Sequence, residues 1–233
     1  MKADLIDSMG SDLTVVDAAR VSFSKKSDWE YDVKEEVDIE SRTISSYFFP
    51  IGLKDKDKKL INYLAKHKHW SPFSHVMLQF RITAPIFVAR QWYRHTVGFA
   101  RNEESRRYIR TEPSVFYPDS WRSAPEGSIK QGSGGTHQQS DTIQQSWQEM
   151  AEHSIEVYNN LISQGVAPEQ ARMILPQGVE TSWVETASLY AYARLCNERV
   201  QDDAQKEIRD LAAQVDQVCK DVAPVSWEAL RYE

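Results

Sequence analysis

Hydrophobic and polar side chains alternate from Val76 to Thr83, with Val76, Leu78, Phe80 and Ile82 on one face. This alternation predicts a strand that is half buried. Elsewhere most apolar residues recur at intervals of three or four, which is the spacing of amphipathic helices. The pattern therefore predicts an α+β chain with a few strands and a helical C-terminal half.

The helical spacing also sets the expected limits of each helix. Ser11 or Asp12 suits the N-cap of a first helix, because a short polar side chain can bond the free N–H groups there. Pro85 suits the start of another, since a proline at the first helical position loses no hydrogen bond. The predicted helices cover residues 12–21, 60 to 67 or 69, 86–96, 143–163, 168–175, 188–200 and 204–222.

Two stretches show neither pattern. Residues 24–59 combine clusters of charge with the aromatic patch Tyr47–Phe49, which indicates a solvated excursion with one anchored point. Residues 123–141 are rich in Gly, Ser and Gln, a composition typical of a mobile loop. We interpret both stretches as insertions in a single domain over residues 1–233.

Composition excludes several classes of protein. The chain of 233 residues can build a core without disulfides, and its two cysteines cannot form a disulfide framework. With 28 basic and 34 acidic side chains, the net charge of −6 argues against a protein that coats nucleic acid. The longest apolar run, 84–89, is far too short to span a membrane, and the segment after Met1 lacks an apolar signal sequence. We therefore expect a cytoplasmic location.

Arginine is concentrated in one segment of this acidic chain. Six of the fifteen arginines lie from Arg90 to Arg110, a segment with only two acids. Arg90 and Arg94 share a face of a predicted helix that is otherwise apolar. Such a cluster is either a solvated face that pairs with nearby acids or an anion site, since guanidinium groups bind phosphate in bidentate fashion. The apolar context favours the anion site.

Other candidate chemistry is weaker. His67, His69 and His75 lie close in sequence, but no cysteine is near and the spacing is not that of a zinc motif, so we expect no metal. Cys196 and Cys219 fall in helical apolar patterns, which favours small core residues over nucleophiles. The sequence has no P-loop, Gly-x-Gly-x-x-Gly or Gly-x-Ser-x-Gly motif.

Three ordered motifs are similar to those of one enzyme family. They are HWSPFSH at 69–75, APIFVARQWYRH at 84–95 and NEESRRY at 102–108, with further matches at 18–22, 171–176 and 204–208. Over nearly the whole chain they resemble the flavin-dependent thymidylate synthases, the ThyX family. The resemblance implies an α+β fold with a small antiparallel sheet, a homotetramer, and FAD as the cofactor. It also implies reductive methylation of dUMP to dTMP, with methylenetetrahydrofolate as the carbon donor and NADPH as the reductant of FAD.

The resemblance further implies roles for individual side chains. Arg107 and Arg172 would bind the phosphate of dUMP, and Arg199 would face the pyrimidine, where a cation stabilises negative charge developing on the ring. Ser105 would position the substrate, unless it only caps a turn. Arg199 and Ser105 are the implied catalytic residues. The implied flavin contacts are Ser22, His69, Ser71, Arg94 and His95, and the implied dUMP contacts are Gln91, Glu103, Ser105, Arg107, Arg172 and Arg199.

The chain departs from the family pattern at three points. The Arg-His-Arg motif of the family becomes Arg-His-Thr at 94–96, and one residue is inserted before Ser105, which makes Arg101 a candidate for the vacated position. Asp203 stands where the family usually has histidine. The spacing over 183–199 also differs.

Two other functions stay open on the sequence alone. A divergent hydroxymethylase would use the same fold, flavin and folate, but water instead of hydride would complete the reaction. A nucleic-acid-binding protein would use the arginine and aromatic side chains of residues 90–110 to hold a phosphate backbone. Product mass distinguishes the first alternative, and salt-sensitive oligonucleotide binding without flavin distinguishes the second.

Overall fold

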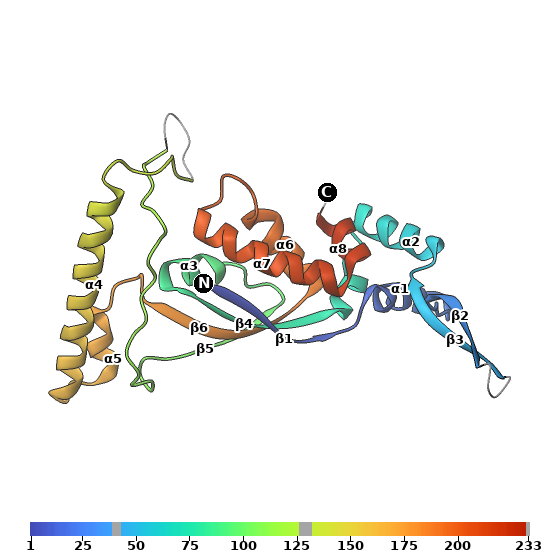
Figure 1. Cartoon of the computed structure of the whole chain (residues 1–233), viewed down its shortest axis with the longest axis horizontal. Coiled ribbons are helices and arrows are strands. Elements are labelled where there is room, and N and C mark those ends of the chain that lie inside the picture. The colour runs from blue at the N-terminus through green and yellow to red at the C-terminus, as the bar shows by residue number, and fades with distance from the viewer. Residues whose placement is uncertain (39–42, 126–131, 232–233) are drawn as a thin grey trace.

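The computed structural model describes residues 1–38, 43–125 and 132–231 (Figure 1). Its main sheet is antiparallel and has four strands in the order β1-β4-β6-β5, with helices on one side. The α+β class and the small antiparallel sheet expected from the sequence are confirmed. The strands are β1 (Lys2–Met9), β4 (Met77–Pro85), β5 (Phe99–Glu103) and β6 (Glu180–Ser188).

The central strand β4 alternates as its sequence predicts. Leu78, Phe80 and Ile82 are fully buried on the face that the helices cover. On the opposite face, Gln79 donates a hydrogen bond to Thr186 Oγ1 over 3.0 Å, so polar side chains join β4 to β6 there. The sheet therefore has one apolar face, which forms the core, and one polar face.

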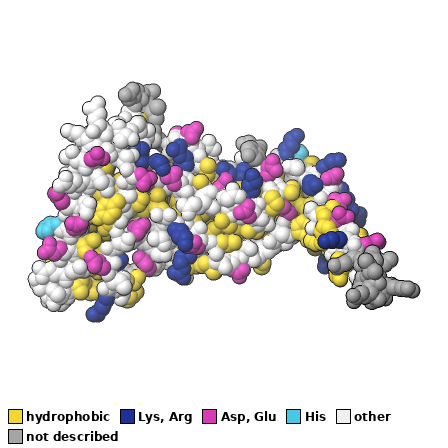
Figure 2. Space-filling model, viewed as in Figure 1, with side chains coloured by type: hydrophobic (Ala, Val, Ile, Leu, Met, Phe, Trp, Pro, Cys, Tyr) yellow, Lys and Arg dark blue, Asp and Glu magenta, His cyan; other side chains and the backbone are white. Residues whose placement is uncertain are grey.

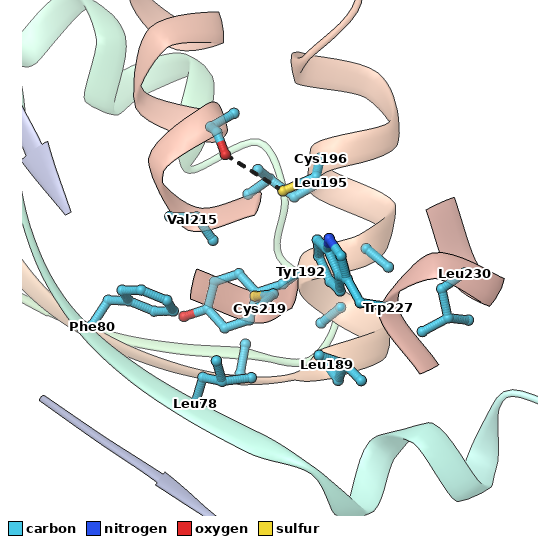
Figure 3. Packing of buried hydrophobic residues seen from close by; sticks show 14 of the residues in the cluster. Leu78, Phe80, Leu189, Tyr192, Leu195, Cys196, Val215, Cys219, Trp227 and Leu230 are labelled. Atoms are coloured by element: carbon cyan, nitrogen blue, oxygen red, sulfur yellow. Dashed lines mark hydrogen bonds between the residues drawn. The ribbon is translucent and has the colours of Figure 1, made fainter. Parts of the chain in front are cut away.

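The core lies between this sheet and the C-terminal helices α6 (Leu189–Arg199), α7 (Lys206–Val222) and α8 (Pro224–Arg231) (Figure 3). The ring of Tyr192 meets that of Phe80 edge to face, with 5.2 Å between centroids. Cys196 and Cys219 are fully buried in this cluster, as small core residues. Burial raises the pKa of both thiols, which keeps them protonated and unreactive.

The remaining elements surround this core. Ser11 caps the first helix, and its N–H donates to Thr14 Oγ1 over 3.0 Å, as the sequence predicts for the N-cap. No described helix is long and apolar enough to cross a bilayer. The helices are α1 (Asp12–Arg20), α2 (Asp55–Lys66), α3 (Ile86–Trp92), α4 (Ser140–Ser163) and α5 (Pro168–Ala171), with 3-10 turns η1 (Val21–Phe23), η2 (Ser71–His75) and η3 (Arg172–Ile174).

The excursion expected over residues 24–59 is solvated, as its exposed residues 30–35 and 45–51 show, but it has regular structure and lacks the expected anchored point. β2 (Glu30–Asp38) and β3 (Thr43–Gly52) pair as an antiparallel hairpin that extends away from the main sheet (Figure 1). Phe48 is 71% exposed, so the aromatic patch anchors nothing within this chain. The hairpin escapes a pattern-based prediction because neither of its faces is buried, and so no alternation is required.

Other boundaries also differ from expectation. The helix expected over 86–96 ends at Trp92, and the one expected over 168–175 divides into α5 and η3. Three strands, β1, β5 and β6, and the helix α8 were not predicted. In the 123–141 stretch, the described residues before Ser140 form neither helix nor named strand, and the part of that prediction at 126–131 lies outside the described residues.

Candidate active site

Two predicted site residues meet where α3 and α6 end. His95 follows α3, and Arg199 is the last residue of α6. Arg199 Nε donates a hydrogen bond to His95 Nε2 over 2.9 Å, although the two residues are 104 positions apart in the chain. Burial and then the Arg199 cation lower the pKa of His95, so the imidazole is neutral and accepts this bond.

Arg101, the candidate for the position of the missing third arginine, makes its polar contacts inside the protein. Its guanidinium turns into the protein, where Nε lies 2.6 Å from Glu185 Oε2. Its Nη1 donates to the main-chain oxygen of His95 over 2.6 Å. Arg101 therefore supports the loop that carries His95 and is not itself presented to a ligand.

Ser105 and Arg107 form a second group after β5. Ser105 Oγ accepts hydrogen bonds from the main-chain N–H and from Nε of Arg107, each over 3.3 Å. The turn-capping role left open by the sequence is therefore present, and the same hydroxyl orients a guanidinium group. Nearby, Thr181 donates to Glu103 Oε1 over 2.7 Å, which fixes the predicted Glu103 at the end of β5.

Three predicted arginines are exposed and suit an anion. Among the described residues, Arg94, Arg107 and Arg172 have no acidic partner, in contrast to Arg101. Arg172 lies on η3, beside α4, and its Nε contacts only the main-chain oxygen of Glu169, over 3.4 Å. In the described part of the chain no hydrogen bond or ion pair links Arg172 to the other predicted residues.

The predicted residue Gln91 belongs to a polar network that the sequence did not indicate. Its amide donates to Gln205, and Gln205 in turn donates to Glu207 Oε2 over 2.8 Å. Arg122 completes the network with a 2.6 Å ion pair to Glu207. Burial opposes ionisation of Glu207, but hydrogen bonds from Arg122 and Gln205 outweigh it and hold the pKa of this carboxyl below its usual value.

This network forms the polar wall of a 420 Å³ cavity beside α3. The opposite walls are aromatic, with Phe87, Phe116, Trp121 and Trp147 among the lining residues. Gln91, Gln205 and Glu207 lie in stretches that match the family, whereas Arg122 belongs to no motif. The long segment between β5 and α4 supplies much of the lining.

A separate hollow lies between η2 and α6. It has a volume of 280 Å³ and is bounded by Trp70, Gly98, Tyr190 and Arg194. The Trp70 and Tyr190 rings are 6.1 Å apart, and Arg194 is exposed. Aromatic walls with a cation at the edge suit a planar, electron-poor ring such as that of a flavin.

The described residues that line this hollow include none of the predicted flavin contacts, but Ser22, His69 and Ser71 lie on neighbouring elements. Arg94 and His95 lie in the turn after α3, which leads to the lining residue Gly98. His69 lines a smaller adjoining space, and Ser71 is exposed at the start of η2. Ser22 lies on η1, directly after α1, and α1 packs against η2. Trp70 and Arg194 were not predicted, although Trp70 lies within the first motif. No group of three His, Cys, Asp or Glu side chains suited to a metal occurs in the ranges that the structure covers.

Comparison with known proteins identifies the family. The family model described as "Thymidylate synthase complementing protein" matches residues 4–225, and the chain belongs to this family. Among its relatives are the flavin-dependent thymidylate synthases of Thermosipho africanus, which is 33% identical over 97% of this chain and 88% of the relative, and of Thermus thermophilus, 31% identical over 97% and 73%.

The fold is also similar to that of a solved structure. The UMP/dUMP methylase PolB from Streptomyces cacaoi, bound with 5-Br dUMP, superposes with a TM-score of 0.79 at 28% identity, over 98% of this chain and 93% of PolB. The PolB structure bound with 5-Br UMP gives a TM-score of 0.77 at 27% identity, over 99% and 93%.

Proposed function

We propose that this protein is a flavin-dependent thymidylate synthase that converts dUMP to dTMP. Its family, its relatives and its similarity to a dUMP methylase support this reaction. The observation that carries the proposal is the contact between His95 and Arg199 at the C-terminal end of α6, a helix whose N-terminal part lines a hollow with aromatic walls. When bound and reduced by NADPH, FAD would supply the hydride that completes the methyl group derived from methylenetetrahydrofolate.

The residues around the hollow between η2 and α6 fit a flavin. We propose that Ser22, His69, Ser71, Arg94 and His95 contact it. Neutral His95 can hold its Nδ1 proton toward a ligand while Nε2 accepts from Arg199. The cation of Arg194 adds a further partner at the edge of the hollow.

A second set of side chains would hold dUMP. Arg107, oriented by Ser105, and Arg172 are the proposed phosphate ligands, because both guanidinium groups are exposed and free of acids in the described ranges. Arg199 would stabilise negative charge that develops on the pyrimidine as its C5 atom becomes nucleophilic. Gln91 and Glu103 would complete the set, and neither buried cysteine is required.

We propose that the active enzyme is a homotetramer in which partner subunits complete each site. In the described part of the chain no hydrogen bond or ion pair links Arg172 to the His95–Arg199 pair, so a partner subunit would complete the set of ligands. Hydrophobic side chains gather beside α4 on the face in Figure 2. Met150 on α4, and Met173 and Ile174 on η3, which packs against α4, are exposed. Such a surface suits contact with another copy of the chain. The single-domain organisation, the two insertions and the cytoplasmic location stay predictions.

The direct test is the mass of the product. Purified protein with FAD, NADPH, methylenetetrahydrofolate and dUMP should yield a nucleotide in which a methyl group replaces one hydrogen. A hydroxymethyl product would support the divergent hydroxymethylase instead. The same assay with UMP tests a second candidate substrate, which the likeness to PolB bound with 5-Br UMP favours. Absence of any nucleotide product in the presence of bound FAD would contradict the proposal.

A further inference from the structure

A fully buried carboxylate, Glu185, is joined through Arg101 to the loop that carries His95. Glu185, on β6, has no exposed surface. The indole nitrogen of Trp92 donates to both carboxylate oxygens over 3.0 Å, and that of Trp183 donates to Oε2 over 3.1 Å. Arg101 supplies the only cationic contact among the described residues, over 2.6 Å. Burial of a charged group costs desolvation free energy even when three donors bind it. A carboxylate in such a place therefore suggests that its geometry serves a purpose.

The phenol groups of Tyr192 and Tyr93 lie near Glu185 and carry no charge themselves. Burial, and then the charge of Glu185, raise the pKa of Tyr192 well above its ordinary value. Burial first, and the charges of Glu103 and Glu185 among the further causes, raise the pKa of Tyr93. Both phenols therefore stay protonated, and Arg101 alone balances the charge of the carboxylate.

Arg101 joins this buried carboxylate to the loop of the candidate site. Its Nε contacts Glu185, and its Nη1 donates to the main-chain oxygen of His95 over 2.6 Å. The guanidinium also lies over the rings of Phe99 and Tyr93, at 4.4 and 5.3 Å from their centroids. A planar guanidinium group that stacks on two rings and donates hydrogen bonds from two of its nitrogen atoms has little conformational freedom. The carbonyl group of His95 is therefore held in one place.

We infer that Arg101 and Glu185 are positioning residues for the proposed reaction. The pair fixes the main chain at His95, the His95 imidazole then receives the hydrogen bond from Arg199, and the Arg199 cation is thereby directed at the pyrimidine. This inference rests on the proposed function and adds to it a support that touches neither flavin nor nucleotide.

The test is a double-mutant cycle with Arg101→Gln and Glu185→Gln. Arg101→Gln alone leaves a buried carboxylate unpaired, and its melting temperature should fall steeply. The double variant carries no charge at this buried pair, and its melting temperature should recover toward wild type. Its kcat/KM for dUMP should nevertheless stay roughly 10- to 100-fold below wild type, because the loop of His95 has lost its support. Recovery of both stability and kcat/KM would mean that the pair is only structural and would overturn the inference.

The His95 tautomer provides a readout without any ligand. In wild type, ¹⁵N NMR should find the proton on Nδ1, because Nε2 accepts from Arg199. In the double variant that preference should be lost. An unchanged tautomer would contradict the inference even if the protein made no dTMP. A wild-type protein that binds FAD, has the expected tautomer and makes no product would contradict the proposed function alone.

The matched control is the pair of Arg231 and Asp216. Its Nε–Oδ1 distance is also 2.6 Å, and the arginine side chain is 14% exposed, as is that of Arg101. This pair joins α8 to α7, and Arg231 also donates to Asn197 on α6. No hydrogen bond or ion pair in the described ranges links the pair to a proposed ligand-binding residue. The variant Arg231→Gln/Asp216→Asn should keep the wild-type His95 tautomer and a kcat/KM within about threefold of wild type. A loss equal to that of the Arg101/Glu185 double variant would show that removal of any such pair suffices, and the inference would fail.

Discussion

Arg199 Nε lies 2.9 Å from His95 Nε2, and this single hydrogen bond joins the end of α6 to the turn after α3. The bond requires an unprotonated Nε2 atom, because the guanidinium can only donate. Protonation of His95 would therefore replace a hydrogen bond with repulsion between two cations. The pair connects the turn after α3 to the end of α6, and it makes the geometry of the candidate site sensitive to pH.

His95 should titrate below its ordinary pKa of 6.5, and Arg199→Gln should raise that pKa because it removes a neighbouring cation. The pKa of His95 is lower in the folded state than in the unfolded state. The contribution of His95 to the free energy of unfolding is therefore present above about pH 6.5 and is lost as pH falls through the folded pKa. NMR titration of the His95 ring protons measures both values. A His95 pKa at or above 6.5 in wild type would contradict the assigned hydrogen bond.

Arg172→Ala should raise the KM for dUMP roughly 10- to 150-fold, which is the loss of a charged hydrogen bond of ~1.5 to 3 kcal/mol. FAD affinity should not change, because Arg172 is proposed to bind only the phosphate. Steady-state kinetics and flavin fluorescence check the two expectations. Arg110→Ala removes another exposed arginine outside the proposed set and serves as the control. Equal dUMP affinity in wild type and Arg172→Ala would refute the phosphate role.

Arg122→Gln should destabilise the fold by about 3 kcal/mol, because Glu207 is then left buried without its cation. The lowered pKa of Glu207 contributes stability that is present above its ordinary value of 4.5 and is lost as pH falls through the folded pKa. Urea unfolding across the acidic range should therefore show a weaker acid dependence in the variant. Identical acid dependence of the two proteins would argue against this ion pair.

Gly178→Ala should disturb the cavity beside α3. A Cβ atom at this position would lie 2.4 Å from Trp147 Cζ2, which forces the indole or the main chain to move. We expect a loss of about 1 to 3 kcal/mol. Gly135 has no atom within 4 Å of such a Cβ and has no positive φ, so Gly135→Ala is the matched control. Thermal unfolding compares the two, and a Gly178→Ala protein as stable as its control would contradict the packing.

Replacement of Cys196 and Cys219 by alanine should leave dTMP formation intact, because both thiols are fully buried with raised pKa values. Each change should cost about 1 kcal/mol of stability, the loss of one buried heavy atom. The assay is turnover of the folded double variant. Complete loss of activity with a native circular dichroism spectrum would mean that a cysteine takes part in the reaction.

The main sheet illustrates how far pattern alone reaches. β4 was predicted because its buried face is uniformly apolar. β6 alternates just as regularly, but its buried face includes Thr181 and Glu185, so the hydrophobic signal is broken. Glu185, one of the residues that interrupt the hydrophobic pattern of β6, is also the carboxylate that pairs with Arg101. Local pattern cannot reveal such a strand, because its burial depends on a partner 84 residues away.

The site was predicted through motifs rather than through pattern. The motifs contain His95, Ser105 and Arg107, and the family resemblance implied Arg199 as well. His95 contacts Arg199, and Ser105 contacts Arg107. The motifs did not reveal that Arg101 turns inward, since the direction of a side chain follows from tertiary packing. Nor did they indicate Trp70 or Arg194, whose proximity arises only when η2 packs beside α6.

The central claim is that a uracil nucleotide binds against the flavin under the cation of Arg199. The most direct measurement is the absorbance spectrum of the FAD-loaded protein during titration with dUMP, for wild type and Arg199→Gln. The account predicts a saturable change in the flavin bands of wild type and a much weaker one in the variant. A flavin spectrum that dUMP leaves unaltered in wild type, or alters equally in both proteins, would contradict it.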